Sequence, residues 1–347
     1  MLNRDITISH KLTIFDTIKK LNELTNISRL ILFVCSDDLK IIGSVTDGDI
    51  RRFLINKPDL SIPILDVCNK KFKFVLNTQN YIDFSNYIQD NLKILPVLDI
   101  NHKLVELIDL AIFKSKIPVE CVIMAGGRGK RLSPLTDNLP KPMLILGNKP
   151  IIEHNIDKLI LFGIKKFYIT LNYLGDKIVN YFGDGSSKGV EIIYIWETKP
   201  LGTAGSLSLI DEINSDHLLL INSDLFTNFD LDMMYKKIIS NNADIVISSK
   251  DYKVDIPFAI FESKDSFVQN FKEKPTYTYH SNAGIYLIKS KLISQIPKNE
   301  FYDITDFIDS LLNDNYKVMH DPILGYWIDI GCPADYKSAQ DLIKLIK

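Results

Sequence analysis

The chain has 347 residues, of which 46% are hydrophobic and 24% are charged, and its formal net charge at pH 7 is −2. This length exceeds the usual size of one domain and predicts two, while the near-neutral charge argues against a nucleic-acid-binding protein with a basic surface. Because the sequence has neither a long apolar run nor the apolar core of a signal peptide near Met1, we expect no membrane partner and a cytoplasmic location.

The cysteines do not follow the spacing of a disulfide framework or a metal cluster. Four are scattered through the chain, mostly within apolar stretches, and we interpret them as reduced core residues. They are Cys35, Cys68, Cys121 and Cys332.

The first part of the chain contains an internal repeat in which Ile31 corresponds to Ile94. A strand, a polar turn and a second strand are predicted in each copy, beginning at Leu30 and at Ile94. Helical patterns precede both copies, at residues 13–24 and 81–91. The repeat therefore predicts a paired α+β module.

This repeat, together with the sequence GSVTDGDI at residues 43–50, resembles a pair of CBS domains. The resemblance implies a regulatory adenosine-type nucleotide bound through Thr46 and Asp49, or a module that serves assembly alone. The second copy carries Asp109 and Ile112 at the corresponding positions, so we predict at most one competent ligand site. Thr46 and Asp49 could equally cap the helix that follows them.

Ile117 and Pro118 are interpreted as the linker between the two predicted domains. The first domain is then the CBS pair at residues 1–117, and the second comprises residues 118–347. A paired N-terminal module of this kind favours a homo-oligomer.

A glycine-rich, basic loop follows an apolar strand at residues 122–124. Gly126, Gly127 and Gly129 would let the backbone approach phosphate oxygens closely, and Arg131 and Lys141 add positive charge. The loop lacks the Ser or Thr that follows the lysine in a P-loop. It also lacks the third glycine of the dinucleotide-binding fingerprint. The pattern indicates a nucleoside triphosphate site of another type.

Five further segments follow in order, namely ETKPLGTAG at 197–205, NSD at 222–224, FKEKP at 271–275, NAGIY at 282–286 and WIDIG at 327–331. With the loop and the PKP at 140–142, they resemble the sugar-1-phosphate nucleotidyltransferases over residues 119–347. The resemblance implies a transferase that makes an NDP-sugar and pyrophosphate. It also implies an α/β, Rossmann-like fold, with helices on both faces of a mostly parallel sheet.

Asp224 and Asp329 match the metal aspartates of that family, so the resemblance implies Mg²⁺ as cofactor. Asp224 follows the predicted strand at 217–221, and the carboxyl ends of strands in open α/β sheets are where ligands bind. Carboxylates and phosphate oxygens are the ligands that Mg²⁺ prefers. The alternatives are a helix N-cap for Asp224 and a surface turn for Asp329.

The family match also assigns the nucleotide site. Arg131 and Lys141 would be the catalytic cations, which stabilise the charge that accumulates during displacement at phosphorus. The implied NTP-binding residues are Ala125, Gly126, Gly127, Gly129, Lys130, Glu197, Gly202 and Thr203. Lys130 departs from the family pattern, in which a small hydroxyl residue is usual.

The attacking phosphate is already ionised, so the reaction needs no histidine as a base. We therefore interpret His154, on a predicted helix at 151–162, as structural.

The sugar phosphate is assigned to Glu273, Lys274, Asn282 and Gly284 by the same match. A lysine from a separate segment would give the incoming phosphate its own counterion and leave Arg131 to the triphosphate. The alternative for residues 272–274 is a solvated, charged strand end.

A CBS pair joined to such a domain resembles enzymes of bacterial nonulosonic acid biosynthesis and mannose-1-phosphate guanylyltransferases. We therefore predict GTP with glucosamine 1-phosphate, or a related hexose 1-phosphate such as mannose 1-phosphate, for surface-glycan or nonulosonic acid biosynthesis. The alternatives are a uridylyl- or thymidylyltransferase and a catalytically silent subunit that senses NDP-sugars.

Overall fold

The computed structural model describes residues 6–24 and 31–346. The chain divides into two compact units, Met1–Lys116 and Ile117–Lys347. Leu30, the first residue of a predicted strand, lies outside the described residues.

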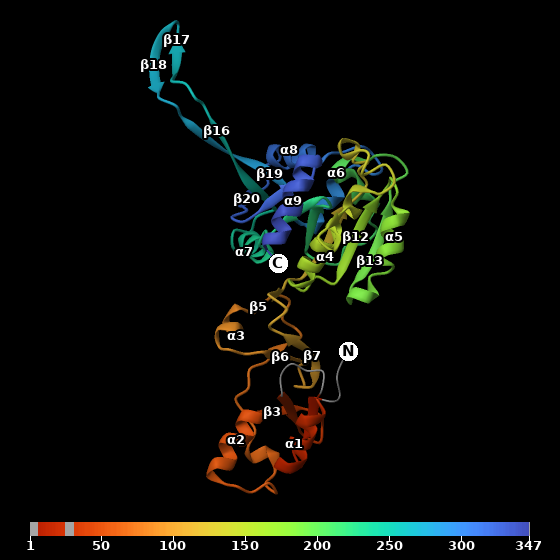
Figure 1. The fold of residues 1–347 in the computed structure, drawn as a ribbon, viewed down its shortest axis with the longest axis vertical. Helices are drawn as coiled ribbons and strands as arrows, with labels where there is room; N and C mark the ends of the chain where they lie inside the picture. The colour runs from red at the N-terminus through yellow and green to blue at the C-terminus, as the bar shows by residue number, and fades with distance from the viewer. Residues whose placement is uncertain (1–5, 25–30, 347) are drawn as a thin grey trace. The chain divides into compact units, whose positions relative to one another are not determined.

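The N-terminal unit contains two small three-stranded sheets with the same topology (Figure 1). The first half contains β1 (Thr7–Ser9), α1 (Ile14–Glu23), β2 (Ile31–Cys35), β3 (Ile41–Thr46) and α2 (Asp47–Asn56). The second half contains β4 (Val75–Leu76), β5 (Ile82–Asp83), α3 (Ser85–Gln89), β6 (Ile94–Leu98), β7 (Leu104–Asp109) and β8 (Ser115–Lys116). In each sheet a parallel pair, β1 with β2 or β4 with β6, is extended by an antiparallel strand, β3 or β7. This symmetry agrees with the sequence repeat.

The two halves differ in their helices. Thr13 caps α1 through a capping box with Asp16, and α1 buries Ile14 and Leu21 in the core of the first half. The predicted helix at 81–91 is wrong over much of its length, since only α3 is helical there. The Asp83 carboxylate accepts a hydrogen bond from the backbone N–H of Ser85 at 2.9 Å. This bond stabilises a turn before α3, so the helix does not extend back to residue 81.

A seven-stranded sheet forms the centre of the C-terminal unit. In spatial order its strands are β13 (Glu191–Trp196), β12 (Lys166–Leu171), β9 (Val119–Met124), β14 (His217–Asn222), β19 (Thr276–Lys289), β16 (Ile245–Asp255) and β20 (Val318–Pro322). Neighbouring strands are parallel except that β19 is antiparallel to both β14 and β16. The predicted α/β class with a mostly parallel sheet is confirmed.

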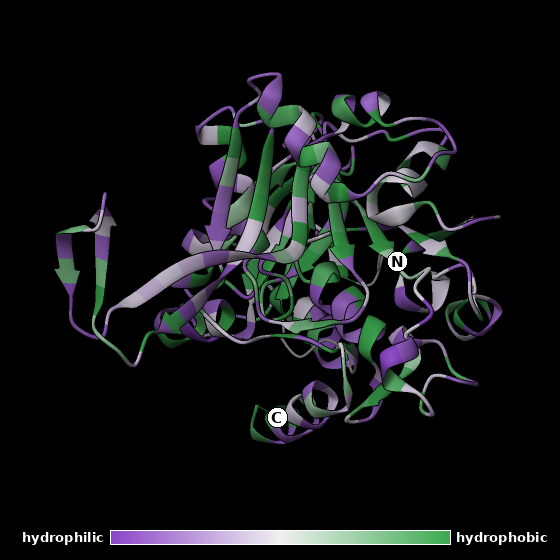
Figure 2. Cartoon of the chain, turned by 90° about the horizontal axis from the view of Figure 1, so that it is seen from above, coloured by the Kyte–Doolittle hydropathy of each residue, from purple (hydrophilic) through white to green (hydrophobic). Residues whose placement is uncertain are grey.

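Both faces of the sheet are buried, as its apolar strands require. Leu218 and Leu220 of β14 pack in a cluster with Phe307, and Leu219 and Ile221, which point to the opposite face, are equally inaccessible. Figure 2 shows the hydrophobic colour along these central strands.

The helices of this unit are α4 (Ile151–Ile160), α5 (Asp176–Phe182), α6 (Gly202–Gly205), α7 (Leu231–Ser240), α8 (Ile304–Asn313) and α9 (Pro333–Leu345). Within the described residues, no helix is long and apolar enough to cross a membrane.

Short strand pairs complete this unit. They are β10 (Ile145–Leu146) with β11 (Lys149–Pro150), β15 (Leu225–Thr227) with β21 (Trp327–Asp329), and β17 (Ile260–Lys264) with β18 (Phe267–Lys272). Strands β16 and β19 continue beyond the sheet as a two-stranded ribbon that ends in the β17–β18 hairpin (Figure 1). We call residues 249–282 the arm.

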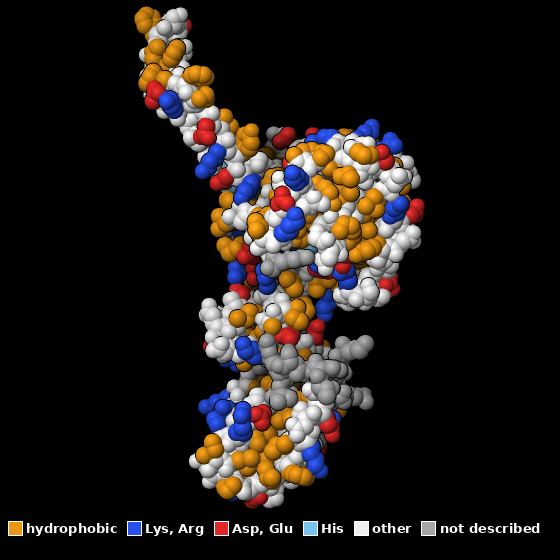
Figure 3. All heavy atoms as spheres, in the orientation of Figure 1, with side chains coloured by type: hydrophobic (Ala, Val, Ile, Leu, Met, Phe, Trp, Pro, Cys, Tyr) orange, Lys and Arg blue, Asp and Glu red, His pale blue; other side chains and the backbone are white. Residues whose placement is uncertain are grey.

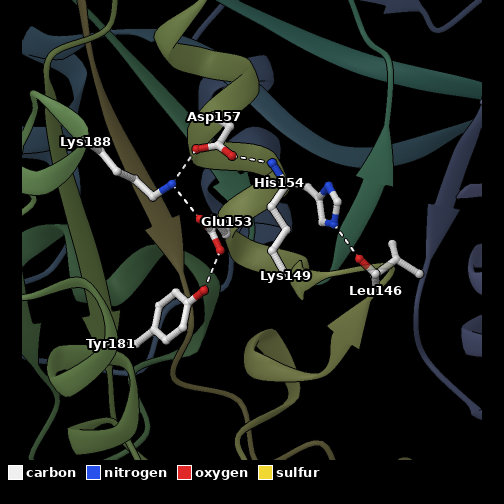
Figure 4. A network of polar contacts seen from close by, with 7 residues as sticks. All are labelled: Leu146, Lys149, Glu153, His154, Asp157, Tyr181 and Lys188. Atoms are coloured by element: carbon white, nitrogen blue, oxygen red, sulfur yellow. Dashed lines mark hydrogen bonds and ion pairs between the residues drawn. The ribbon is translucent and has the colours of Figure 1, made fainter. Parts of the chain in front are cut away.

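Helix α4 carries a network of polar contacts (Figure 4). Lys188 donates to Glu153 at 2.6 Å and to Asp157 at 2.7 Å, and Lys149 also pairs with Asp157. The Nε2 atom of His154 lies 2.8 Å from the carbonyl oxygen of Leu146. These contacts hold α4 against the segments around it, and His154 contributes to this packing, as its structural interpretation predicts.

Candidate active site

The glycine-rich loop starts where β9 ends, at Met124. The backbone N–H of Ala125 donates to the carbonyl of Thr170 at 3.1 Å, so Ala125 is a buried anchor below the loop. Gly129 has a φ of 61°, and a Cβ at this position would lie 3.1 Å from the Cβ of Lys141. Glycine therefore allows the loop to turn tightly beside Lys141.

The loop borders a cleft of about 470 Å³. Ten residues predicted for the nucleotide, the metal or catalysis line this cleft together: Gly126, Gly127, Gly129, Lys130, Arg131, Lys141, Glu197, Gly202, Thr203 and Asp224. They come from segments far apart in the sequence, and several follow the ends of strands β9, β13 and β14 of the central sheet. The cleft is large enough for a nucleotide-sized ligand.

Asp224 lines this cleft, and Asp329 lies beside Asp224 but is not among the described residues that line the cleft. The antiparallel pairing of β15 with β21 sets Leu225 opposite Asp329, and the backbone N–H of Ile330 donates to the carbonyl of Asp224 at 3.1 Å. Asp224 is followed directly by a strand and Asp329 ends one. Neither the helix-cap alternative for Asp224 nor the surface-turn alternative for Asp329 therefore applies.

Lys141 supplies positive charge to this acidic pair. Its Nζ atom hydrogen-bonds to Oδ2 of Asp224 and lies 3.9 Å from Oδ1 of Asp329. The Oδ1 atoms of both aspartates are buried and have no hydrogen-bond partner among the residues that the structure describes. Burial, with the nearby charge of Asp224, raises the pKa of Asp329 above its usual value.

The two unpartnered carboxylate oxygens fit a hard divalent cation. Buried carboxylate oxygens are costly without a partner, and a cation that they share would remove this cost. In the described part of the chain, no group of three or more His, Cys, Asp or Glu side chains could hold a metal ion. A cation here would therefore have two protein carboxylates and would depend on phosphate oxygens or water for its other ligands.

Glu197, Gly202 and Thr203 form another part of the cleft wall, and a Cβ on Gly126 would lie 3.0 Å from Oε1 of Glu197. Burial raises the pKa of Glu197, whose Oε2 accepts a hydrogen bond from the backbone N–H of Leu201 at 3.2 Å. Gly202 has a φ of 77°, and a Cβ there would lie 2.7 Å from the carbonyl oxygen of Tyr302. This wall is consequently fixed by backbone packing as well as by side chains.

The four residues predicted for the sugar phosphate are not brought together. A Cβ on Gly284 would lie 2.5 Å from Nδ2 of Asn222, which lines the cleft, and Asn282 accepts from the backbone N–H of Gly284 at 3.0 Å. Gly284 is therefore next to the cleft wall, whereas Asn282 lines a separate pocket with His280 and His320. Glu273 and Lys274 are exposed on the arm, and neither is among the described residues that line the cleft.

Thr46 and Asp49 of the N-terminal unit form a capping box at the start of α2. The Thr46 hydroxyl accepts from the backbone N–H of Asp49 at 3.2 Å, and the Asp49 carboxylate accepts from the backbone N–H of Thr46 at 2.9 Å. Asp49 also pairs with Arg52 at 2.6 Å. Helix capping therefore accounts for both residues in this structure.

Two residues that line the cleft, Thr170 and Phe301, lie outside every segment that sequence reasoning singled out. Thr170 is a polar residue near the end of an apolar strand, KFYITL, and strand ends at one edge of a parallel sheet are a usable signal for a site. Phe301 lies in a loop before α8, with 63% of its surface exposed. No local pattern identifies such a loop residue.

Comparison with known proteins identifies the family of the C-terminal unit. The family model described as nucleotidyl transferase matches residues 120–344, and the CBS domain model matches residues 1–56. A probable mannose-1-phosphate guanylyltransferase 1 of Oryza sativa subsp. japonica is 31% identical over 227 residues, covering 63% of this chain and 63% of that protein. The chain therefore spans somewhat less than two thirds of the length of this relative.

Two other proteins are similar over nearly their whole length. The D-glycero-α-D-manno-heptose 1-phosphate guanylyltransferase of Aneurinibacillus thermoaerophilus is 32% identical, with 64% of this chain and 97% of that protein covered. A crystal structure of a putative glucose-1-phosphate thymidylyltransferase from Bacillus anthracis, in complex with a sucrose, has a TM-score of 0.54 at 26% identity, and the similarity covers 66% of this chain and 96% of that one. The chain belongs to the nucleotidyl transferase family, and it carries a CBS domain at its N-terminus.

Proposed function

We propose that this protein transfers a nucleotidyl group from a nucleoside triphosphate to a sugar 1-phosphate and releases pyrophosphate. The supporting observation is that Asp224 and Asp329 each have a buried oxygen with no hydrogen-bond partner among the described residues, beside a glycine-rich loop with Arg131 and Lys141. The cleft and the residues beside it contain the groups that this reaction requires. These groups are an anion-binding loop, fixed cations and two carboxylates that fit a divalent ion. The relatives that match most of the chain's C-terminal unit carry names of the same reaction class.

In this proposal an oxygen of the sugar phosphate attacks the α-phosphorus, and the new P–O bond forms as the bond from the α-phosphorus to the bridging oxygen breaks. The pyrophosphate leaves with that electron pair. Because the nucleophile is already an anion, the protein needs no general base. Arg131 and Lys141 orient the triphosphate and stabilise the charge that develops on its oxygens.

Asp224 and Asp329 are proposed to hold Mg²⁺, which would supply further charge stabilisation at the phosphates when bound. Gly126, Gly127 and Gly129 would present backbone N–H groups to the triphosphate, and Lys130 would add a charge. Glu197, Gly202 and Thr203 would surround the nucleoside. Glu273, Lys274, Asn282 and Gly284 are proposed for the sugar phosphate.

We propose GTP as the nucleotide, with glucosamine 1-phosphate or another hexose 1-phosphate such as mannose 1-phosphate as acceptor. The guanylyltransferases among the relatives support this choice. A thymidylyltransferase is the second candidate, because the similar crystal structure carries that description.

A pyrophosphate-release assay tests the proposal. Each of the four NTPs, and dTTP, is combined with mannose, glucose, glucosamine and heptose 1-phosphates in the presence of Mg²⁺. We expect release that requires both substrates and is highest with GTP, and none from an Asp224→Asn control. Highest release with dTTP or UTP would overturn the choice of base, and no release from any pair would overturn the proposed reaction.

For the N-terminal unit we propose a CBS pair, at residues 1–117, that regulates or assembles the enzyme. The match of residues 1–56 and the repeated sheet topology support a pair. Calorimetry with adenine nucleotides tests ligand binding, with a Thr46→Val variant as the comparison. Binding that the substitution leaves unchanged would contradict a site at Thr46.

A further inference from the structure

The arm is a long, regular ribbon that leaves the central sheet. Strands β16 and β19 pair without interruption from Ser249 opposite Asn282 to Asp255 opposite Thr276. The β17–β18 hairpin then closes its end, from Ile260 opposite Lys272 to Lys264 opposite Phe267. Figure 1 shows the ribbon projecting from the sheet, and Figure 3 shows hydrophobic side chains along it.

The tip of the arm exposes large apolar side chains. The exposed fractions are 73% for Phe258, 61% for Phe261, 77% for Phe267, 58% for Val268 and 61% for Phe271. A two-stranded hairpin is marginally stable in water by itself, and a concentration of exposed aromatic rings marks an interaction surface. The tip therefore needs a surface that covers it.

The same arm carries Glu273 and Lys274, which lie between the tip hairpin and the start of β19. The cations that line the cleft are Lys130, Arg131 and Lys141, and Lys141 is already paired with Asp224. A second phosphorylated substrate brings further negative charge. Among the described residues, the cleft has no separate lysine or arginine for it.

With its strands paired as described, the arm holds Lys274 outside its own cleft, which Lys274 does not line. From Asn282 to Thr276 the paired strand advances six positions, or about 20 Å at about 3.3 Å per residue. Lys274 could reach that cleft only if the ribbon bent back toward it. A second copy of the chain can receive the arm with its pairing intact.

We propose that the arm of one copy enters the cleft of a second copy, where Lys274 and Glu273 complete the sugar-phosphate site. The exchange is reciprocal, as in other symmetric dimers. Phe301, exposed at the cleft, provides an apolar contact for the arriving tip. Four phenylalanines from each of two arms bury on the order of 1,000 Å², which is what a specific interface requires.

This inference rests on the proposed function, and subunit complementation tests it. Lys274→Ala chains have a defective arm and an intact cleft, whereas Asp224→Asn chains have an intact arm and a defective cleft. Both variants are co-expressed with different affinity tags, and the mixed oligomer is isolated by two purification steps. Pyrophosphate release is measured for the mixed oligomer and for each variant alone.

We expect low activity from each variant alone and restored activity in the mixed oligomer, because one cleft receives an intact arm. In an exchanged dimer that site should recover about half of the wild-type rate. A mixed oligomer no more active than its two components, when the wild type is active, would overturn the arm exchange and leave the proposed function standing. It would instead indicate that each arm acts on its own cleft.

A second measurement applies even if no substrate pair is turned over, an outcome that would refute the proposed function. Sedimentation compares the wild type with a Phe261→Ser, Phe267→Ser, Phe271→Ser variant. We expect a dimer or larger oligomer that loses an association step in the variant, with an unchanged melting temperature. A monomeric wild type, or a variant with the same assembly, would overturn the inference.

Discussion

Two clusters in the C-terminal unit contain the same chemical groups but differ in how those groups are satisfied. On α4, Glu153 and Asp157 are paired with Lys188, and Lys149 adds a second cation at Asp157 (Figure 4). At the cleft, by contrast, Lys141 serves two aspartates, each of which keeps a buried oxygen without a hydrogen-bond partner in the described part of the chain. A completed network indicates a structural role, whereas an incomplete one indicates that a ligand is expected.

The pKa values of the two clusters shift in opposite directions. Burial opposes ionisation of Asp157, but the hydrogen bonds from Lys149 and Lys188 outweigh it and lower the pKa. Burial and the charge of Asp224 raise the pKa of Asp329, with only partial compensation by Lys141. The cluster on α4 therefore stabilises the fold without any ligand. The cluster at the cleft needs an added cation to compensate its carboxylates fully.

The strongest test of this contrast compares the same substitution in both clusters. Asp224→Asn should reduce the rate of pyrophosphate release by about 100-fold or more and weaken its Mg²⁺ dependence, because a carboxylate near the reacting phosphates is lost. Asp157→Asn should keep the wild-type rate. Steady-state assays across Mg²⁺ concentrations give both results, and equal rate losses in the two variants would remove the distinction.

Lys188→Ala should have the next largest effect, this time on stability. The substitution leaves the carboxylates of Glu153 and Asp157 with fewer partners, so the free energy of unfolding should fall by about 1 to 3 kcal/mol. Urea denaturation measures the change. Lys344→Ala is the control, because its pair with Asp341 is exposed and should contribute little. A Lys188 variant as stable as this control would contradict a structural role for the network.

Asp329→Asn should have a smaller effect of the opposite sign. It removes a partly buried negative charge next to Asp224, so the metal-free protein should become slightly more stable, by at most about 1 kcal/mol. Thermal denaturation in EDTA measures this change. In the presence of GTP, added Mg²⁺ should raise the melting temperature of the wild type more than that of the variant. A clear loss of stability in EDTA would show that Asp329 is a structural carboxylate.

His154 gives the smallest expected effect, on the pH dependence of stability. Burial lowers the pKa of His154 below 6.5, so the folded protein favours the neutral ring. The neutral ring therefore contributes fully to the free energy of unfolding above about pH 6.5. This contribution is lost as the pH falls below that value. His154→Asn should show a shallower decline in unfolding free energy than the wild type between about pH 7 and 5. Parallel declines would exclude this contribution.

Motifs that are continuous in sequence gave reliable predictions of the fold and of one wall of the cleft. The strands before the glycine-rich loop and before Asp224 are apolar runs with a clear end, so their positions in a parallel sheet follow from local pattern. The pairing of β15 with β21 could not be predicted in this way. Each strand has only three residues, and they pair across about a hundred positions of chain.

The arm shows a different limit. A strand has the same alternating pattern of side chains whether it lies within a sheet or projects from it. The sequence pattern therefore did not reveal that residues 249–282 extend beyond the central sheet. The family match assigned Lys274 to the sugar phosphate, but the described chain places it away from its own cleft. Position in the assembled structure depends on tertiary contacts that a motif does not contain.

The ammonium group of Lys141 stands between the two carboxylates and acts as a built-in counterion. A free divalent ion must therefore compete with a covalently tethered cation, whereas triphosphate oxygens offer that lysine a new partner. We expect the bare protein to bind Mg²⁺ weakly and the nucleotide to strengthen that binding many-fold, so that metal and nucleotide enter as one unit.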